Sequence, residues 1–314
     1  MSNTNPSLIF MGTPEFSVPT LEALINSGDF LVKAVITQED KPVGRNQTLQ
    51  APAVKICAQK HKIQVLQPKK IGEIFDKLKE LAPDLIVVLA YGQIIPQNIL
   101  DLPKFGCLNI HASLLPKYRG AACLQAAILN GDKETGLTIM KMEAGLDTGP
   151  ILKQFLIPLN GKESIEELHD QAALLGGQII VPVLKDYLDG KLIPQTQDDS
   201  LSSYVKTIKK EDGRLDFQKS AVELERQIRA FNPWPGSFAL TEDDKMLKIG
   251  AVAQEIFPIT NHLPGELFTD NQSLMLATKD GALQIQSLQL AGGKMMTAKE
   301  FITGHQNFIG KILK

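Results

Sequence analysis

Residues 84–90 read Asp84-Leu85-Ile86-Val87-Val88-Leu89-Ala90, an apolar run of strand length that no polar residue interrupts after its first position. A strand with one solvent-exposed face alternates apolar and polar residues, whereas a strand buried on both faces is apolar throughout. We therefore expect this segment to form the central strand of a parallel sheet that helices cover on both sides.

On either side of this segment, short β-branched runs alternate with stretches of helical period, which is the pattern of βαβ units. This alternation predicts an α/β domain with a Rossmann-like parallel sheet over residues 1–190. The other expected strands are residues 8–11, 31–37, 63–66, 105–111, 136–142 and 151–157. The first expected helix ends near Ser27, and the other expected helices cover residues 53–60, 71–81, 121–129 and 164–188.

The pattern changes after a polar segment without periodicity, residues 194–200, so we expect a linker over residues 191–205. Residues 206–314 contain one amphipathic helical pattern, at 221–231, and otherwise short strands separated by turn residues. Such regular short strands predict a small β-barrel of the OB-like kind. The expected strands are residues 237–241, 246–253, 265–268, 273–278 and 282–290.

Composition narrows the class of protein. The chain has 314 residues, a formal net charge of −2 and three cysteines without a Cys-x-x-Cys pair. We found no histidine at metal spacing from a cysteine, so we expect neither a disulfide framework nor a metal site. No stretch is long and apolar enough for a membrane helix, and the first residues do not resemble a signal peptide, so we expect a cytoplasmic protein.

The first strand-to-helix turn contains neither a G-x-G-x-x-G fingerprint nor a P-loop lysine, so nucleotide chemistry lacks support there. Ligands of open parallel sheets bind beyond the carboxyl ends of the strands. One such end carries Asn109 and His111, which point to the same side because side chains alternate along a strand. Asp147 follows a later strand between Gly145 and Gly149. Taken alone, Asn109 and His111 are better explained as polar groups satisfied by nearby backbone, and Asp147 as an ordinary aspartate in a glycine-rich turn.

Together, however, they form a pattern that resembles the folate-dependent formyltransferases. The motif is Asn109-x-His111-x-Ser113-Leu114-Leu115-Pro116-x-Tyr118-Arg119-Gly120, followed by Gly145-Leu146-Asp147-Thr148-Gly149. The resemblance extends over nearly the whole chain, with matching segments at residues 10–16, 42–45, 90–96 and 229–236. The chain departs from the family pattern in two ways: residues 46–48 lack the usual lysines, and Cys123 stands where proline is common.

The resemblance implies transfer of a formyl group from 10-formyltetrahydrofolate to the α-amino group of methionine on initiator tRNA. Asn109 would donate a hydrogen bond to the formyl oxygen, His111 would stabilise charge and act as the acid, and Asp147 would orient His111 and relay a proton. An amine is already a nucleophile, so no covalent step is needed, and we expect Cys107 and Cys123 to be inert. The residues expected to bind folate are Ser113, Leu114, Leu115 and Pro116, with Tyr91 and Gly92 on a second loop.

The same resemblance assigns tRNA binding to two regions. Arg45 would reach the acceptor end, while the C-terminal barrel, including Lys206 and Lys209, would hold the tRNA body. Residues 206–314 carry a net charge of +1 and residues 1–205 a net charge of −3, which favours the smaller domain as the phosphate-facing part. We expect a monomer.

Three other classes compete with this interpretation. A sugar-amine formyltransferase shares the Asn, His, Ser-Leu-Leu-Pro and Asp pattern but lacks Gly12-Thr13-Pro14-Glu15-Phe16. Glycinamide ribonucleotide transformylase would leave residues 206–314 unexplained. An RNA-binding protein without catalysis does not require the intact set of Asn109, His111 and Asp147.

Overall fold

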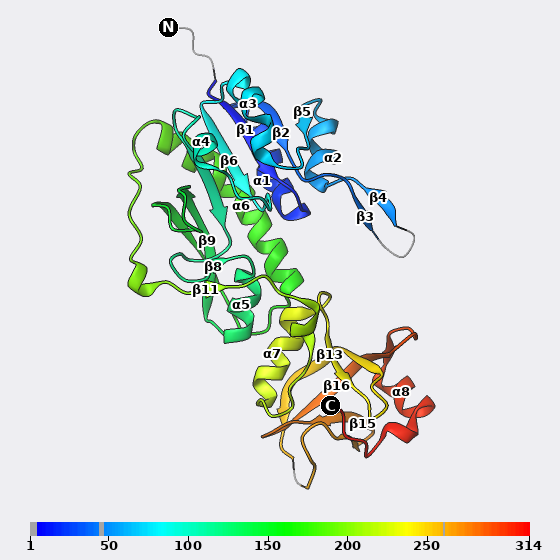
Figure 1. Cartoon of the computed structure of the whole chain (residues 1–314). Helices are drawn as coiled ribbons and strands as arrows, with labels where there is room; N and C mark the ends of the chain where they lie inside the picture. The colour runs from blue at the N-terminus through cyan, green and yellow to red at the C-terminus, as the bar shows by residue number, and fades with distance from the viewer. Residues whose placement is uncertain (1–4, 44–46, 260) are drawn as a thin grey trace. The chain divides into compact units, whose positions relative to one another are not determined.

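The computed structural model describes residues 5–43, 47–259 and 261–314 (Figure 1). The chain divides into two compact units, and segments from the first half of the chain contribute to both. The first unit comprises Met1–Cys123, Glu134–Pro158 and Leu168–Val205, and the second comprises Leu124–Lys133, Leu159–Glu167 and Lys206–Lys314.

The first unit is built on a sheet to which seven strands of the described chain belong, in the order β10-β9-β7-β6-β1-β2-β5. Strand β6 takes the middle position with all of its residues buried, as its apolar sequence predicts. The strands are β1 (Ser7–Gly12), β2 (Leu31–Ile36), β5 (Gln64–Leu66), β6 (Leu85–Leu89), β7 (Cys107–His111), β9 (Glu134–Lys141) and β10 (Ile151–Pro158).

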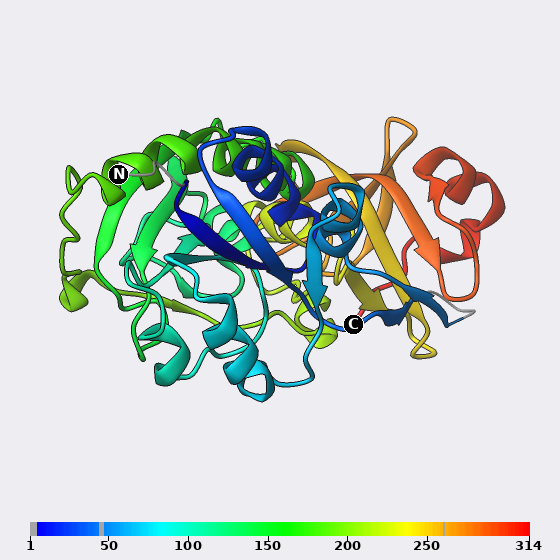
Figure 2. The same ribbon diagram turned by 90° about the horizontal axis from the view of Figure 1, so that it is seen from above.

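Helices cover both faces of this sheet. Figure 2 shows α1 and α6 on one face and α3 and α4 on the other. On the α3 and α4 face, Val88 and Cys107 pack in one cluster with Leu78 and Ile99. On the opposite face α6 lies close to α1, since a Cβ at Gly177 would be only 2.8 Å from the Pro19 carbonyl oxygen. The helices of this unit are α1 (Val18–Asn26), α2 (Ala53–Lys60), α3 (Phe75–Leu81, preceded by a 3-10 turn, Ile71–Ile74), α4 (Gln97–Leu100) and most of α6 (Ile165–Leu188). Helix α5 (Cys123–Asn130) belongs to the second unit from Leu124 on.

The expected α/β class is confirmed, but the sheet is mixed rather than wholly parallel. Strands β1, β2, β5, β6 and β7 run parallel to their neighbours among these strands, whereas β9 is antiparallel to β7 and β10 is antiparallel to β9. A loop joins β9 to β10 where a helical crossover would be needed to keep the strands parallel. This antiparallel extension brings β9 directly beside the strand that carries Asn109 and His111.

Residues 191–205, expected to be a linker, instead pack on the first unit. Strand β11 (Tyr204–Val205) pairs in parallel with β8 (Arg119–Gly120), and Gln195 forms a bridge with Ile151. Gln197 is buried. Most residues of this segment are exposed, as its polar composition predicts, but Gln197 bonds to groups of the first unit.

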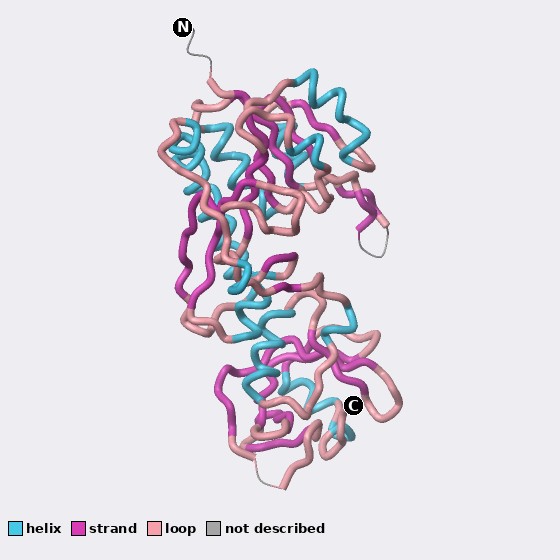
Figure 3. Tube along the Cα trace, turned by 60° about the vertical axis from the view of Figure 1, so that its left-hand side comes forward, coloured by secondary structure: helices cyan, strands magenta, loops and turns pink. Residues whose placement is uncertain are grey.

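A hairpin that the sequence does not predict follows β2. Figure 3 shows its strands, β3 (Lys41–Val43) and β4 (Thr48–Gln50), in magenta as a short antiparallel pair. The residues of β4 are exposed and no alternation of apolar and polar residues marks the pair, which explains why pattern analysis missed it. Arg45, which we expect to contact tRNA, lies outside the described residues.

The second unit contains the expected small antiparallel barrel. Within the described chain, its strands follow the order β12-β13-β16-β15-β14, with β17 paired to β16. Helix α7 (Ala221–Phe231) has the expected bounds and begins with a capping box between Ser220 and Glu223. The strands are β12 (Ser237–Leu240), β13 (Met246–Phe257), β14 (Leu267–Asp270), β15 (Ser273–Ala277), β16 (Ala282–Leu290) and β17 (Met296–Thr297).

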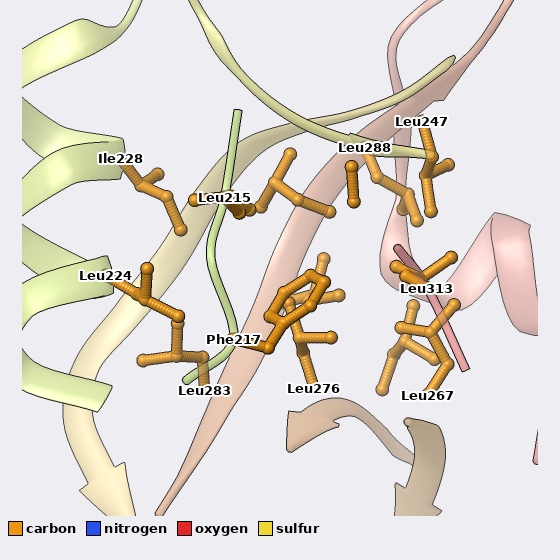
Figure 4. Close-up of a cluster of buried hydrophobic side chains, with 14 of the residues drawn as sticks. Leu215, Phe217, Leu224, Ile228, Leu247, Leu267, Leu276, Leu283, Leu288 and Leu313 are labelled. Carbon is orange, nitrogen blue, oxygen red and sulfur yellow. The ribbon is translucent and has the colours of Figure 1, made fainter. Parts of the chain in front are cut away.

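The last residues of the chain close this barrel between its two edge strands. The backbones of Lys314 and Leu240 exchange two hydrogen bonds, and Leu313 donates one to Gly265, next to β14. Figure 4 shows the Leu313 side chain in the cluster of buried leucines that fills the barrel, near Leu267. The C-terminal segment therefore supplies both the missing edge hydrogen bonds and part of the core.

One expectation for this unit is wrong: α7 is not its one helix. Residues Ala298–Gly304 form α8, with a capping box between Thr297 and Glu300 and with Phe301 fully buried. Its seven residues make up only two turns and present one fully buried residue, so the sequence shows no helical period there. Among the described residues, no helix combines the length and the apolar composition needed to cross a bilayer.

Candidate active site

Strand β7 holds the two polar residues that the sequence singles out. Asn109 pairs with Val88 on β6 and Met140 on β9, and His111 pairs with Thr138 on β9. Their side chains share the side of β7 on which Cys107 packs into the α4-facing core. The carboxyl end of β7 therefore carries the amide of Asn109 and the imidazole of His111, two residues apart.

The His111 ring has a fixed orientation. Its Nε2 lies 2.9 Å from the carbonyl oxygen of Tyr118, so Nε2 carries a hydrogen and donates it there. Its Nδ1 lies 3.6 Å from an Asp147 carboxylate oxygen, beyond hydrogen-bond distance but close enough for a strong charge interaction. Nδ1 is thus the ring nitrogen without a hydrogen-bond partner among the described residues, and it lies beside a carboxylate.

Asp147 reaches His111 through a tightly folded loop between β9 and β10. Its backbone is left-handed, with φ of +54°, and its Oδ2 accepts a hydrogen bond of 2.8 Å from the Gly120 backbone. The loop returns so closely that a Cβ at Gly149 would lie 1.8 Å from the Lys141 carbonyl oxygen. Gly149 therefore permits a backbone path that any other residue would block.

Two further residues, which the sequence did not indicate as site residues, hold this loop. Gln197 donates hydrogen bonds of 2.8 and 2.7 Å to the carbonyl oxygens of Asp147 and Gly149. The Gln197 amide oxygen in turn accepts bonds from Arg119, whose side chain is almost wholly buried and also pairs with Asp199 at 2.7 Å. The Arg119 position within the motif was visible in the sequence, but its partner lay in the presumed linker, where no pattern pointed to it.

The Asn109 side chain is half-buried, and within the described part of the chain nothing forms a hydrogen bond with it. A satisfied structural asparagine would have its amide occupied. Asn109, His111 Nδ1 and the Asp147 carboxylate therefore form an open set of polar groups at one strand end.

Comparisons with known proteins match this architecture along the chain. Residues 7–184 match the formyl transferase family model, and residues 207–306 match the model of the formyl transferase C-terminal domain. A methionyl-tRNA formyltransferase from Geobacter sulfurreducens is 47% identical over 300 residues, which cover 95% of this chain and 93% of that protein.

The chain belongs to the formyl transferase family.

Solved structures share the fold of this formyl transferase at lower identity. The methionyl-tRNA formyltransferase from Clostridium thermocellum has a TM-score of 0.58 and 19% identity, with 80% of this chain and 94% of that chain covered. An N-formyltransferase from Helicobacter canadensis, in complex with folinic acid and dTDP-3-aminofucose, has a TM-score of 0.63 and 22% identity, with 90% and 99% covered. At these identities, the similarity establishes the fold alone.

Hydrogen bonds hold the Ser-Leu-Leu-Pro loop of this formyl transferase to itself and to β9. The Ser113 hydroxyl is buried and donates to the Lys117 carbonyl oxygen at 2.6 Å. Thr138 on β9 donates to the Ser113 carbonyl at 2.6 Å and accepts from the Leu115 backbone at 3.0 Å. The Ser113 side chain thus serves the loop itself, whereas Leu114 and Pro116 remain half-exposed for contact with a ligand.

The second loop expected to bind folate turns at Tyr91 and Gly92. The Tyr91 side chain lies in the core cluster, and its buried hydroxyl has no partner among the described residues. Burial raises the pKa of this phenol to about 12. The Tyr91 carbonyl oxygen accepts hydrogen bonds from Thr13 and Gln38, and Gly92 has φ of +86°. Both the Tyr91 ring and the Tyr91 carbonyl oxygen are therefore engaged within the protein.

Cys123 is the nearest cysteine to the site. Its sulfur lies 3.3 Å from His111 Nε2 and donates to the carbonyl oxygens of Tyr118 and Gly120 at 3.1 and 3.2 Å. Burial, with a smaller contribution from the Asp147 charge, raises the pKa of this thiol to about 12. The formyl transferase therefore holds a neutral thiol here, which packs under the imidazole and is a poor nucleophile.

Lys206 and Lys209 lie at the start of the second unit and are exposed. They do not belong to the set formed by Asn109, His111 and Asp147, all of which lie in the first unit.

Proposed function

We propose that this formyl transferase moves the formyl group of 10-formyltetrahydrofolate to the α-amino group of methionine on initiator tRNA. The observation that carries the proposal is the 47% identity to a protein named methionyl-tRNA formyltransferase over both units of the chain. The open set of Asn109, His111 and Asp147 supplies groups suited to this reaction.

Asn109 is the donor for the charge that develops on the formyl oxygen. Attack on the formyl carbon pushes electron density onto that oxygen, and a preorganised donor in a partly dry site stabilises it by about 3–4 kcal/mol. The Asn109 amide is suited to this task because it is positioned by β7 and has no competing partner among the described residues.

His111 supplies a second donor when its ring carries a hydrogen on Nδ1. Because the Tyr118 carbonyl occupies Nε2, only Nδ1 can face the substrate, and a protonated ring would present N–H there. The Asp147 carboxylate at 3.6 Å balances the positive charge of that ring. His111 then protonates the nitrogen of the folate as the bond to the formyl carbon breaks.

Asp147 accepts the proton that the attacking amine must lose. Its Oδ2 is held by Gly120, while Oδ1 has no hydrogen-bond partner among the described residues and is free to take the proton directly or through water. Gln197 and Arg119 keep the backbone of Asp147 in place during this step.

Folate binding is assigned to the two loops that flank the site. The family uses folate derivatives, and the Helicobacter canadensis relative holds folinic acid. In this chain, we assign folate contacts to Leu114 and Pro116, which are half-exposed and apolar, and to Ser113, Leu115, Tyr91 and Gly92 on the same two loops. A shape held by internal hydrogen bonds suits a planar ligand because little entropy is lost on binding.

The tRNA is assigned to Arg45 and to the second unit, with Lys206 and Lys209 among its phosphate contacts. Both lysines are exposed, as long-range contacts with a polyanion require. The similarity to the Geobacter sulfurreducens methionyl-tRNA formyltransferase covers 95% of this chain, which supports tRNA as the acceptor.

A comparison of acceptors tests the proposal. Purified full-length chain and 10-formyltetrahydrofolate are mixed with charged initiator tRNA or with a dTDP-linked amino sugar, and the formylated products are quantified. We expect kcat/KM for the tRNA to exceed that for the sugar by at least about a thousandfold, which is roughly 4 kcal/mol of discrimination. Preferential formylation of the amino sugar would replace the proposal with the sugar-amine alternative.

A further inference from the structure

Three side chains that commonly bind metal ions lie together outside the active site. Glu22 comes from α1, Cys57 from α2, and His61 from the residue that ends α2. One donor atom of each side chain lies within 4.8 Å of the donor atoms of the other two. Among the described residues, no other group of three or more such side chains has its donor atoms this close together.

The fold brings these residues together for simple reasons. Cys57 and His61 are separated by one helical turn, so their side chains lie on the same face of α2. Helices α1 and α2 pack against each other, which places Glu22 opposite that face. Cys57 is 6% exposed, while Glu22 and His61 are half-buried at the rim.

Neighbouring groups do not occupy these donor atoms. Among the described residues, the side chains of Glu22, Cys57 and His61 form no hydrogen bond or ion pair, with one another or with any other group. A carboxylate, a thiol and an imidazole that meet without partners form an unusual surface for two packed helices, because polar groups at such positions are normally satisfied.

We propose that Glu22, Cys57 and His61 form a binding site for Zn²⁺. One sulfur, one nitrogen and one oxygen donor suit this borderline ion, and three protein ligands leave the fourth tetrahedral position for water or a small anion. Ligands about 2.0–2.3 Å from a common ion lie roughly 3.5 Å apart, so the donors must approach one another by about 1 Å. The half-buried side chains of Glu22 and His61 have the freedom to make that movement.

The site is separate from the chemistry of formyl transfer. Helix α1 covers the face of the sheet opposite α3 and α4, whereas Asn109 and His111 share the side of β7 that faces α4. An ion at this position would join α1 to α2 without touching the reacting groups, and it would stabilise the folded chain in proportion to its occupancy.

This proposal differs from the sequence-based expectation of no metal site. The spacing of Cys57 and His61 is one that a helix converts into a shared face, but two residues alone do not make a site. The third donor, Glu22, is distant in the sequence and becomes visible only when α1 and α2 are packed.

Metal titration of the full-length chain tests the proposal. Protein stripped with a chelator is titrated with Zn²⁺ against a chromophoric competitor, and with Co²⁺ while the thiolate-to-cobalt charge-transfer band is recorded. We expect one equivalent of ion and a band that shows sulfur coordination. Glu22→Gln, Cys57→Ala and His61→Ala should each lower Zn²⁺ affinity by more than about 100-fold, since loss of even an outer-shell partner costs 10–100-fold.

Cys107→Ala is the matched control, because this cysteine is also buried but has no such neighbours, and it should retain the affinity and the Co²⁺ band. Glu22→Gln keeps the shape of a half-buried side chain and carries the test if Cys57→Ala fails to fold. Failure of the wild-type chain to bind Zn²⁺ would overturn the proposal. Unchanged affinity and an unchanged band in the three site variants would overturn it too.

Discussion

At the residue scale, the hydrogen bonds of a side chain distinguish the residues that would act on substrate from the residues that support the site. The Asn109 side chain and His111 Nδ1 have no hydrogen-bond partner in the described structure, whereas the Ser113 hydroxyl donates to a carbonyl oxygen of its own loop. Residues of the same sequence motif therefore have two different roles. Only the first kind of residue is available to stabilise charge that develops during the reaction.

Cys123 provides a test at this scale. Because the pKa of its thiol is raised to about 12, the thiol stays protonated below that pH, and the thiolate needed for alkylation is scarce at pH 8. We expect iodoacetamide to label Cys123 in the folded chain about a thousandfold more slowly than an ordinary cysteine of pKa 8.5, as measured by mass spectrometry. Urea-unfolded chain serves as the control and should be labelled rapidly. Fast labelling of the folded chain at pH 8 would show that the thiol is not held neutral.

At the element scale, the site depends on a loop and a strand pair that lie far apart in the sequence. Gln197, from the segment before β11, holds the carbonyl groups of Asp147 and Gly149, and Arg119 at the start of β8 holds Gln197. A small displacement of Asp147 would separate its carboxylate from His111, and misplacements near 1 Å can cost about 100-fold in rate.

Removing this support should slow catalysis without abolishing folding. We expect Gln197→Ala to lower kcat at least about tenfold with a smaller change in the KM for folate, because the loop that orients Asp147 loosens. Gln195→Ala is the matched control: its side chain is exposed, and surface substitutions usually alter free energies by less than about 0.5 kcal/mol. Equal kcat values for the two variants would show that Gln197 does not position the aspartate.

This scale also shows how far sequence reasoning reaches. The buried run of β6, the ends of α2 and α7, and the shared face of Asn109 and His111 follow from periodicity, which is a local property. The role of Gln197 does not, because a buried glutamine between polar neighbours has the same local pattern as a linker residue. The antiparallel turn from β9 to β10 was also missed, since strand direction depends on how the connection folds rather than on the strand residues.

At the scale of the whole molecule, the end of the chain decides whether the second unit is a closed barrel. Residues 311–314 bond to β12 and to β14 and so remove two open edges. Leu313 points into the core (Figure 4), while its neighbour Ile312 is 39% exposed.

The two residues offer a matched pair of variants. Leu313→Ala should lower the free energy of unfolding of the second unit by about 2–5 kcal/mol, because a buried leucine is lost and a cavity remains. Ile312→Ala should change it by less than about 1 kcal/mol. Thermal unfolding of the full-length variants measures both, and similar melting temperatures for the two would argue against closure of the barrel by Leu313.

One measurement tests the function of the whole chain most directly. It is the single-turnover rate at which formylmethionyl-tRNA forms from 10-formyltetrahydrofolate and charged initiator tRNA. The rate is measured for the wild-type chain and for Asp147→Asn. The amide keeps the shape and the acceptor for the Gly120 N–H but cannot take the proton of the amine. We expect efficient formation by the wild type and a rate at least about 100-fold lower for Asp147→Asn at an unchanged melting temperature. Absence of product with the wild-type chain, or equal rates for the two proteins, would contradict the proposed reaction and the role of its aspartate.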